Sequence, residues 1–243
     1  MIRITSVANP LIKKWTALKM AKGRKESGRF LVEEKHLIEE AKKAGILETL
    51  IVLEGQSSLN HTDMVVVSDN VMKKLSFTKS LPSYMAVCTI SEPQLVNPDK
   101  IVVLNQLQDP GNIGTIIRTA LAFGYDGVVL SLDCVDLYND KLLRASQGAL
   151  FHLPVIQRDL GVYLAQIKKQ GMSVIGSFVK QAVPLSKFVF PKRFALVVGN
   201  EGSGISESIG ELCDERVTIE MAHFESLNVN VAAAILLYAG KTA

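Results

Sequence analysis

The sequence contains little that would point to an exported or membrane-bound protein. It has only three cysteines in 243 residues, and they show neither CxxC spacing nor the density of a disulfide scaffold. Its longest apolar run, from Val231 to Ala239, is less than half of the roughly 20 residues needed to cross a bilayer. The first residues lack the apolar core of a signal peptide. We therefore expect a cytoplasmic protein with reduced thiols and no membrane segment.

Metal-binding patterns are also missing. The four histidines show neither HExxH nor any other metal spacing, and no metal site is predicted. What the chain does contain is apolar: 48% of its residues are hydrophobic and 21% are charged, which is typical of a globular protein with a real core. Its length allows one large domain or two of moderate size.

Positive charge gathers at one end of the chain. The first 29 residues carry eight basic side chains against one acid, Glu26, whereas residues 99–243 carry 13 basic and 14 acidic residues. A basic block of this size favours a phosphate-rich partner such as a nucleic acid, although a solvated helix face would look the same.

The pattern of apolar residues divides the chain in two. Residues 1–90 read as a small α/β domain, with a helix from Pro10, a strand-like run at 30–32, a helix ending near Gly45, strand-like runs at 49–53, 64–67 and 84–90, and a short helix after Asp69. The proline-containing stretch 91–98 is predicted to be a linker.

Residues 99–243 alternate strand and helix, which predicts a mostly parallel sheet covered on both faces. The expected strands are 101–105, 126–131, 173–178, 194–198 and 216–219, and the expected helices are 113–123, 139–146, 159–169 and 227–239. The last helix is apolar almost all round, so we expect it to be buried on every side within a dimer interface.

Three motifs follow strands of this second domain. In such sheets ligands bind beyond the carboxyl ends of the strands, so the motifs are expected to converge on one site. The first, DPGNIGTIIRTA at 109–120, delivers a turn into a helix and carries Asn112 and Arg118. A guanidinium there can bind a phosphate or a carboxylate; taken alone, Arg118 would more often form a surface ion pair.

The second motif, VVGNEGSG at 197–204, has three glycines in six residues around Glu201. Its G-x-x-G-x-G spacing is not that of a dinucleotide-binding loop, and a plain tight turn is the alternative. The third, IEMAHFESLNVNVA at 219–232, places Ser226 and Asn228 at the start of a helix, where either could simply act as a cap.

Together these motifs resemble those of the SPOUT methyltransferases, in the SpoU/TrmH family that methylates ribose 2′-hydroxyls of RNA. The resemblance covers 99–243 and includes LYNDKLLRASQGALFHLPV at 137–155; residues 1–90 resemble more loosely the family's ribosomal-protein-like RNA-binding domain. It implies an α/β fold with a deep C-terminal trefoil knot, S-adenosylmethionine (S-adenosyl-L-methionine) as cofactor, an rRNA or tRNA partner, and a homodimer in which two chains complete each site.

Carried over by position, the resemblance implies two sets of site residues. The catalytic set is Asn112, Arg118, Glu201, Ser226 and Asn228. The cofactor contacts are Gly199, Gly202, Ile219, Met221 and Leu227.

The chain departs from the family pattern mainly in the third motif. Glu220 stands where the family usually has Pro, Asn230 where it has Ser, and the stretch 222–225 is one residue short. The loop on the adenine side of the cofactor is therefore expected to be reshaped. The rival interpretation is an RNA-binding protein that keeps the fold but has lost catalysis.

Overall fold

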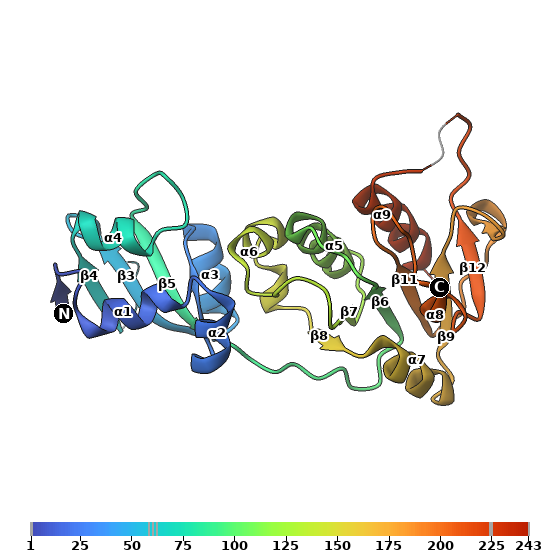
Figure 1. Ribbon diagram of the computed structural model, residues 1–243, viewed down its shortest axis with the longest axis horizontal. Helices are drawn as coiled ribbons and strands as arrows, with labels where there is room; N and C mark the ends of the chain where they lie inside the picture. Colours follow the sequence, from blue (N-terminus) through green and yellow to red (C-terminus); the bar gives the residue numbers. More distant parts are fainter. Residues whose placement is uncertain (1, 58, 60, 62, 224–225, 243) are drawn as a thin grey trace. The chain divides into compact units, whose positions relative to one another are not determined.

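The computed structural model describes residues 2–57, 59, 61, 63–223 and 226–242. It divides into two compact units (Figure 1), the first formed by Met1–Glu92 with Asp136–Phe151 and the second by Pro93–Val135 with His152–Ala243. Sequence analysis predicted a linker at 91–98 and assigned all of 99–243 to the second domain. The division at residues 92 and 93 falls within that linker, but residues 136–151 pack with the first unit.

The first unit is built on a five-stranded mixed sheet with the order β1-β4-β3-β5-β2. Strand β5 runs antiparallel to its neighbours β3 and β2, and the remaining pairs are parallel. The strands are β1 (Ile2–Ile4), β2 (Arg29–Val32), β3 (Leu47–Leu53), β4 (Met64–Val67) and β5 (Tyr84–Thr89).

Helices cover both faces of this sheet. They are α1 (Pro10–Ala17), α2 (Ala21–Ser27), α3 (Lys35–Lys43) and α4 (Asp69–Leu75). Ile12 and Trp15 of α1 and Met72 of α4 share one apolar core with alternate residues of the strands, while α3 packs against β3 and β5 through Leu37 and Ile38. Asn9 caps α1: its Oδ1 accepts a hydrogen bond from the amide of Leu11 over 2.8 Å.

The segment 136–151 packs with this unit through contacts of single residues, which the apolar periodicity of the sequence does not reveal. It contains α6 (Asp140–Ser146) and the 3₁₀ turn η1 (Ala149–Phe151). The ring of Phe30 lies 4.6 Å from that of Tyr138, between centroids, and the buried guanidinium of Arg24 pairs with Asp136 over 3.2 Å. These contacts explain why the segment packs with the first unit although it interrupts the second one in sequence.

The second unit is a seven-stranded sheet, and all of its recorded pairings are parallel, as predicted. Its order is β10-β12-β9-β11-β6-β7-β8. The strands are β6 (Lys100–Leu104), β7 (Gly127–Ser131), β8 (Val155–Arg158), β9 (Ser173–Ser177), β10 (Val183–Pro184), β11 (Phe194–Val198) and β12 (Glu215–Thr218). Sequence analysis missed β8 and β10 because both are short edge strands without apolar alternation.

Helices again form two layers on this sheet. They are α5 (Pro110–Ala122), α7 (Leu160–Lys169), α8 (Glu207–Gly210) and α9 (Val229–Gly240), with a 3₁₀ turn η2 (Leu185–Lys187). Helices α7 and α8 share a core with one face of the sheet, and α5 packs against α9 (Figure 1).

The expectation that α9 is buried on every side is wrong for the single chain. Ala233, Leu236 and Leu237 are buried, but Val231, Ile235 and Tyr238 are 48%, 37% and 58% exposed. The exposed residues recur at intervals of three and four, so they form a stripe along one side of the helix.

Candidate functional site

The three motifs lie where the sequence placed them, beyond the carboxyl ends of parallel strands. Helix α5 follows β6, the loop 199–206 follows β11, and the loop 219–228 follows β12. Strands β6 and β11 are direct neighbours, and β9 separates β11 from β12. Segments more than 100 residues apart therefore meet at one edge of the sheet.

A chain of hydrogen bonds joins the first and third motifs. Asn228 caps α9, its Oδ1 accepting from the amide of Asn230 over 2.9 Å. Asn230 in turn donates from Nδ2 to Oδ1 of Asn112 over 2.7 Å, at the start of α5. Asp109 caps α5 by accepting from the amide of Asn112 over 3.0 Å. The two helix N-termini are thus linked directly by side chains.

The second motif joins the same chain. Asn112 Nδ2 donates to Oε1 of Glu201 over 2.6 Å, a charge-assisted bond across 89 positions of sequence. Asn200 ties the loop back to the sheet by donating to the carbonyl of Gln106 over 2.8 Å, and its Oδ1 accepts from the amide of Gly202 over 2.9 Å. Asn112, Glu201 and Asn230 therefore form one network.

The backbone geometry of the loop requires glycine at two positions, 199 and 204. A Cβ on Gly199 would lie 2.2 Å from the backbone of Gly204 and Ile205, so only glycine allows these backbones to approach. Gly204 adopts a left-handed conformation with φ of 72° and pairs with Asn200 in an isolated bridge. The loop is therefore a tight turn that is closed by the bridge between Asn200 and Gly204.

A pocket of about 100 Å³ opens at the third motif, between the loop that follows β12 and helix α9. Three of the five predicted cofactor residues line it, namely Ile219, Met221 and Leu227; Gly199 and Gly202 are not among its lining residues. Ser226, predicted as catalytic, lines the pocket as well. The other lining residues come from the ends of β9 and β12 and from α9: Ser177, Phe178, Val179, Val217, Thr218, Ala232 and Leu236.

Sequence analysis missed the contribution of residues 177–179. They form the end of β9 and the two residues after it, and their signal was no more than the carboxyl end of a parallel strand without a polar motif. The strand order reveals their role, because β9 lies next to β12 and brings Phe178 against the third motif.

Glu220, which stands where the family usually has Pro, anchors the loop that follows β12. Its carboxylate accepts hydrogen bonds from the hydroxyl of Ser186 and, over 3.3 Å, from the backbone amide of the same residue in η2. The Ser186 hydroxyl is the main cause that lowers the pKa of this exposed carboxyl below its usual range. Phe224 and Glu225, in the shortened stretch, lie outside the described residues.

Arg118 is one of the exposed side chains of the predicted site. It lies on the exposed side of α5 and makes no hydrogen bond or ion pair with any residue that the structure describes. The expected structural alternative, a surface ion pair within the chain, is therefore not formed by the described residues. Its guanidinium is available for a phosphate or carboxylate.

Metal clusters and membrane-spanning helices are both absent from the described part of the chain. No three His, Cys, Asp or Glu side chains there gather closely enough to hold a metal ion. No helix among these residues is long and apolar enough to span a bilayer.

Known proteins resemble the chain over nearly its whole length. Residues 99–238 match the model of the SpoU rRNA methylase family, and residues 9–86 match a substrate-binding domain described as MRM3-like. A 23S rRNA (guanosine(2553)-2′-O)-methyltransferase of Bacillus subtilis is 36% identical over 98% of both chains.

Solved structures agree with this. A crystal structure of an RNA 2′-O ribose methyltransferase is 33% identical, with a TM-score of 0.82 over 98% of both chains. The SpoU methyltransferase AviRb of Streptomyces viridochromogenes, in complex with the cofactor AdoMet, is 27% identical, with a TM-score of 0.85 over 96% of this chain and 97% of the other.

Proposed function

Because the chain belongs to the SpoU rRNA methylase family, we propose that it transfers a methyl group from S-adenosylmethionine to a ribose 2′-hydroxyl of structured RNA. The observation that carries this proposal is the hydrogen-bonded network of Asn112, Glu201 and Asn230 beside a pocket. Three separate segments supply polar groups to one place, which a purely structural core has no need to do.

The lining of the pocket fits the cofactor in its chemistry, because it combines apolar side chains with a few hydroxyl groups. Phe178, Ile219, Met221 and Leu227 offer apolar surface to an adenine ring, and Ser177 and Ser226 offer hydroxyls. S-adenosylmethionine supplies an electrophilic methyl group when it is bound. Gly199 allows the adjoining loop to close on itself, because a Cβ there would lie 2.2 Å from the backbone of Gly204 and Ile205.

We assign Arg118 the role of binding the RNA phosphate next to the target ribose. Its guanidinium has no partner among the described residues and can form two parallel hydrogen bonds to a phosphate. Arginine guanidinium groups keep their protons in proteins and are poor general bases, so we assign Arg118 an orienting and electrostatic role.

The remaining catalytic residues hold the site in shape. Glu201 fixes the amide of Asn112, Asn228 caps α9, and Ser226 contributes to the wall of the pocket. Such support matters because a reacting hydroxyl must be held in line within a fraction of an ångström.

The replacement Arg118→Ala tests the function. We expect methyl transfer to RNA to be lost while calorimetry shows unchanged binding of S-adenosylmethionine. Arg3→Ala is the control, because Arg3 is an exposed arginine of the first unit that pairs with Glu54. Undiminished transfer by Arg118→Ala would refute its role, and absence of cofactor binding by the wild type would favour the non-catalytic RNA-binding alternative.

Ribosomal RNA is the proposed substrate class, with transfer RNA as the other outcome. The support is the B. subtilis relative, which acts on a guanosine of 23S rRNA and matches this chain from end to end. Mapping 2′-O-methyl groups in rRNA and tRNA from cells with and without the protein decides between the two.

The finer architecture is also proposed. Residues 1–90 would bind RNA, with support from the matched substrate-binding domain, and residues 99–243 would carry out transfer. A trefoil knot near the C-terminus is supported by the match to the SpoU rRNA methylase family and by the return of the chain after β12 to pack α9 against α5. A cytoplasmic location is consistent with an RNA substrate.

A homodimer is proposed from the stripe on α9. Val231, Ile235 and Tyr238 are exposed there, and Leu121 of the neighbouring α5 is 36% exposed. Exposed apolar side chains that line up on adjacent helices are typical of an interface.

A further inference from the structure

The two helical layers of the first unit differ sharply in charge. The layer of α1, α2 and α4, extended by the connection 18–20 and the loop 76–80, carries nine basic residues against two acids, Glu26 and Asp69. The basic residues are Lys13, Lys14, Lys19, Lys22, Arg24, Lys25, Lys73, Lys74 and Lys79. On the other side of the sheet, α3 with its N-cap carries three lysines and three glutamates.

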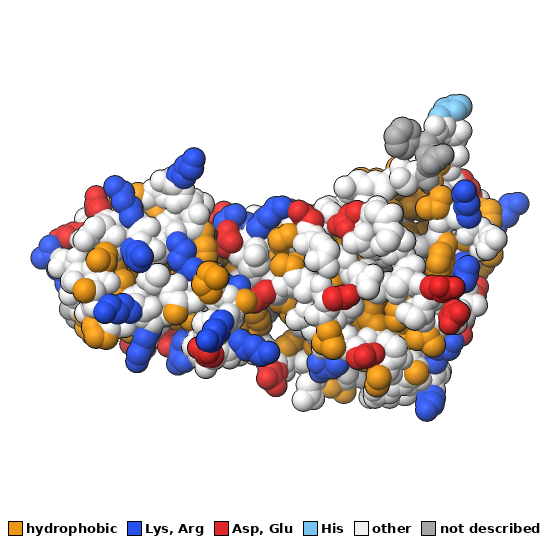
Figure 2. All heavy atoms as spheres, in the orientation of Figure 1, with side chains coloured by type: hydrophobic (Ala, Val, Ile, Leu, Met, Phe, Trp, Pro, Cys, Tyr) orange, Lys and Arg blue, Asp and Glu red, His pale blue; other side chains and the backbone are white. Residues whose placement is uncertain are grey.

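The two helical layers differ even more in how many of their lysines form ion pairs. On α3, Lys43 pairs with Glu40 over 2.7 Å and Lys35 lies 4.0 Å from Glu39. On the opposite layer, six exposed lysines form no ion pair with any residue that the structure describes; we call them the basic face. They are Lys13, Lys14, Lys25, Lys73, Lys74 and Lys79. In Figure 2, Lys and Arg side chains outnumber acidic ones over α1 and α4.

The core directs these lysines outward. Lys13 and Lys14 lie between Ile12 and Trp15, both buried, and Lys73 and Lys74 lie between the buried Met72 and Leu75. Helices α1 and α4 pack against each other on the same apolar cluster. Because the apolar side chains fix which side of each helix faces the sheet, the four lysines project from the opposite side.

The loop 76–80 is held rigidly at the end of α4. The buried carboxylate of Glu33 accepts hydrogen bonds from the Ser76 hydroxyl over 2.9 Å, from the Phe77 amide over 2.6 Å, and from the Thr78 hydroxyl. A buried carboxylate needs such donors, since an unpaired charge in the core is costly.

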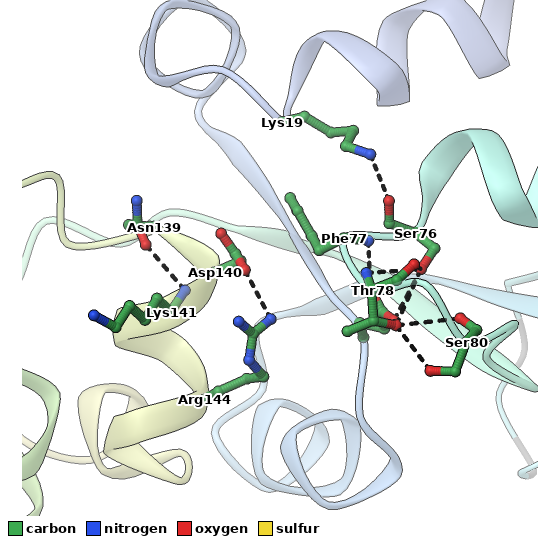
Figure 3. A network of polar contacts seen from close by, with 10 residues as sticks. Lys19, Ser76, Phe77, Thr78, Ser80, Asn139, Asp140, Lys141 and Arg144 are labelled. Atoms are coloured by element: carbon green, nitrogen blue, oxygen red, sulfur yellow. Dashed lines mark hydrogen bonds and ion pairs between the residues drawn. The ribbon is translucent and has the colours of Figure 1, made fainter. Parts of the chain in front are cut away.

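The loop 76–80 is also held by Lys19, which follows helix α1. Lys19 donates to the carbonyl of Ser76 and places its ammonium 5.3 Å from the centre of the Phe77 ring. Figure 3 shows Lys19 directed at Ser76, and the side chains of Thr78 and Ser80 joined to each other. Lys79 is therefore carried on a fixed loop beside α4.

We propose that the basic face binds the phosphate backbone of the RNA substrate, an assignment that rests on the proposed function. Six ammonium groups that have no ion-pair partner among the described residues can exchange counterions for phosphates at little cost, whereas the paired lysines of α3 would first have to break their ion pairs. The surface carries backbone affinity and leaves the choice of nucleotide to the second unit.

The salt dependence of RNA binding tests this assignment. Two double variants, Lys13→Gln with Lys14→Gln and Lys73→Gln with Lys74→Gln, each remove two charges. We expect each to lower the slope of log affinity against log salt by about 1.5 and to weaken binding roughly tenfold near 0.15 M salt. The KM for RNA should rise accordingly, with kcat at saturating RNA and the Kd for S-adenosylmethionine unchanged.

Helix α3 provides the matched control. Lys35→Gln with Lys43→Gln removes the same charge from the same unit, and we expect it to leave the slope unchanged. The probe is rRNA transcribed in vitro, bound by the full chain with circular dichroism to check folding. Wild-type slopes in both basic-face variants, or an equal loss in the α3 control, would overturn the proposal.

The two proposals fail in different ways. If the wild type transfers no methyl group but its RNA affinity still depends on the basic face, the proposed reaction is wrong and the surface assignment stands. If transfer occurs with KM and salt slope insensitive to these lysines, the surface assignment is wrong and the reaction stands.

Discussion

Asn230 donates a hydrogen bond from Nδ2 to Oδ1 of Asn112 over 2.7 Å and thereby fixes which way the Asn112 amide points. Asn112 then donates from its own Nδ2 to Glu201. Because a carboxylate can only accept, Glu201 dictates the donor order along the whole chain. The Oδ1 of Asn230 remains buried without a partner among the described residues. Asn230, which stands where the family usually has Ser, is therefore part of the network.

The first prediction concerns this orientation. In Asn230→Asp the new carboxylate can no longer donate, so Asn112 would be flanked by two acceptors and could not satisfy both with the same geometry. We expect kcat for methyl transfer to fall about tenfold or more, as for the loss of one buried hydrogen bond. The Kd for S-adenosylmethionine should change little.

Asn230→Ser is the comparison for this variant, because serine is the residue usual in the family. Its hydroxyl can donate, so we expect a smaller loss than in the nearly isosteric Asp variant. Equal activity of wild type and Asn230→Asp in single-turnover assays would contradict the role assigned to Asn230.

A second prediction compares two glycines of one loop. Gly199→Ala places a Cβ 2.2 Å from backbone atoms of Gly204 and Ile205, whereas the nearest atom to a Cβ on Gly202 is 3.7 Å away. We expect Gly199→Ala to destabilise the protein by about 1–3 kcal/mol, as for overpacking elsewhere. Gly202→Ala should leave the melting temperature near that of the wild type, and equal melting of the two variants would refute this account.

A third prediction concerns Glu220. Its carboxylate anchors the loop that carries Ile219 and Met221 to Ser186. Glu220→Ala should raise the Kd for S-adenosylmethionine about three- to tenfold, the size of one net hydrogen bond. The lowered pKa means that the anchor is present above the usual carboxyl range and is lost only as the pH falls through the lowered value.

Ser186→Ala removes the same anchor from the other side and should reproduce the weaker binding. Isothermal titration at pH 7 measures both variants. If either bound the cofactor as tightly as the wild type does, the anchor would be irrelevant to the pocket.

A fourth prediction concerns alkaline pH. Burial raises the pKa of the Cys88 and Cys134 thiols, and raises that of Cys213 to about 11. The folded state therefore keeps these thiols protonated while the unfolded chain ionises them from about pH 8.5. Stability should be fully present below that pH and should fall as the pH rises, for Cys213 until about 11.

Denaturant unfolding with a reductant present, between pH 7.5 and 10, measures this slope. Burial also raises the pKa of Tyr138 to about 12, which extends the decline at higher pH. Cys213→Ala should make the slope shallower without changing its sign. A flat stability profile across this range would show that the thiols ionise equally in both states.

A fifth prediction tests the dimer. Ile235→Glu introduces a charge into the exposed stripe of α9, and Val162→Glu introduces the same charge at an apolar residue of α7 that is 69% exposed. Sedimentation should find a dimer for the wild type and for Val162→Glu, and a monomer for Ile235→Glu. A monomeric wild type would refute the proposed interface.

The sequence predicted the features that depend on local patterns. Apolar periodicity identified most strands and helices, and the strand–turn–helix signal at 109–120 predicted that Asn112 would stand at a helix start beyond β6. The rule that ligands bind at the carboxyl ends of parallel strands predicted that motifs 109–120 and 197–204 would meet, and Asn112 does bond to Glu201.

Contacts between distant segments could not be read from those patterns. The packing of Tyr138 on Phe30, the entry of Phe178 into the pocket and the bond from Asn230 to Asn112 each join residues with no shared periodicity. The exposure of Val231, Ile235 and Tyr238 was likewise hidden, because an apolar helix gives the same sequence signal whether its second side meets the same chain or another one.

By itself, the sequence determined the parallel sheet, the family resemblance and the polar residues of the site, since these follow from residue types at short spacing. Only the tertiary structure decided which of those residues touch and that β9 brings Phe178 to the pocket. It also decided that the lysines of α1 and α4 project together and form no ion pair with a described residue. The reason is physical: strand order and helix packing minimise exposed apolar area over the whole chain, and that global balance sets the distances between side chains.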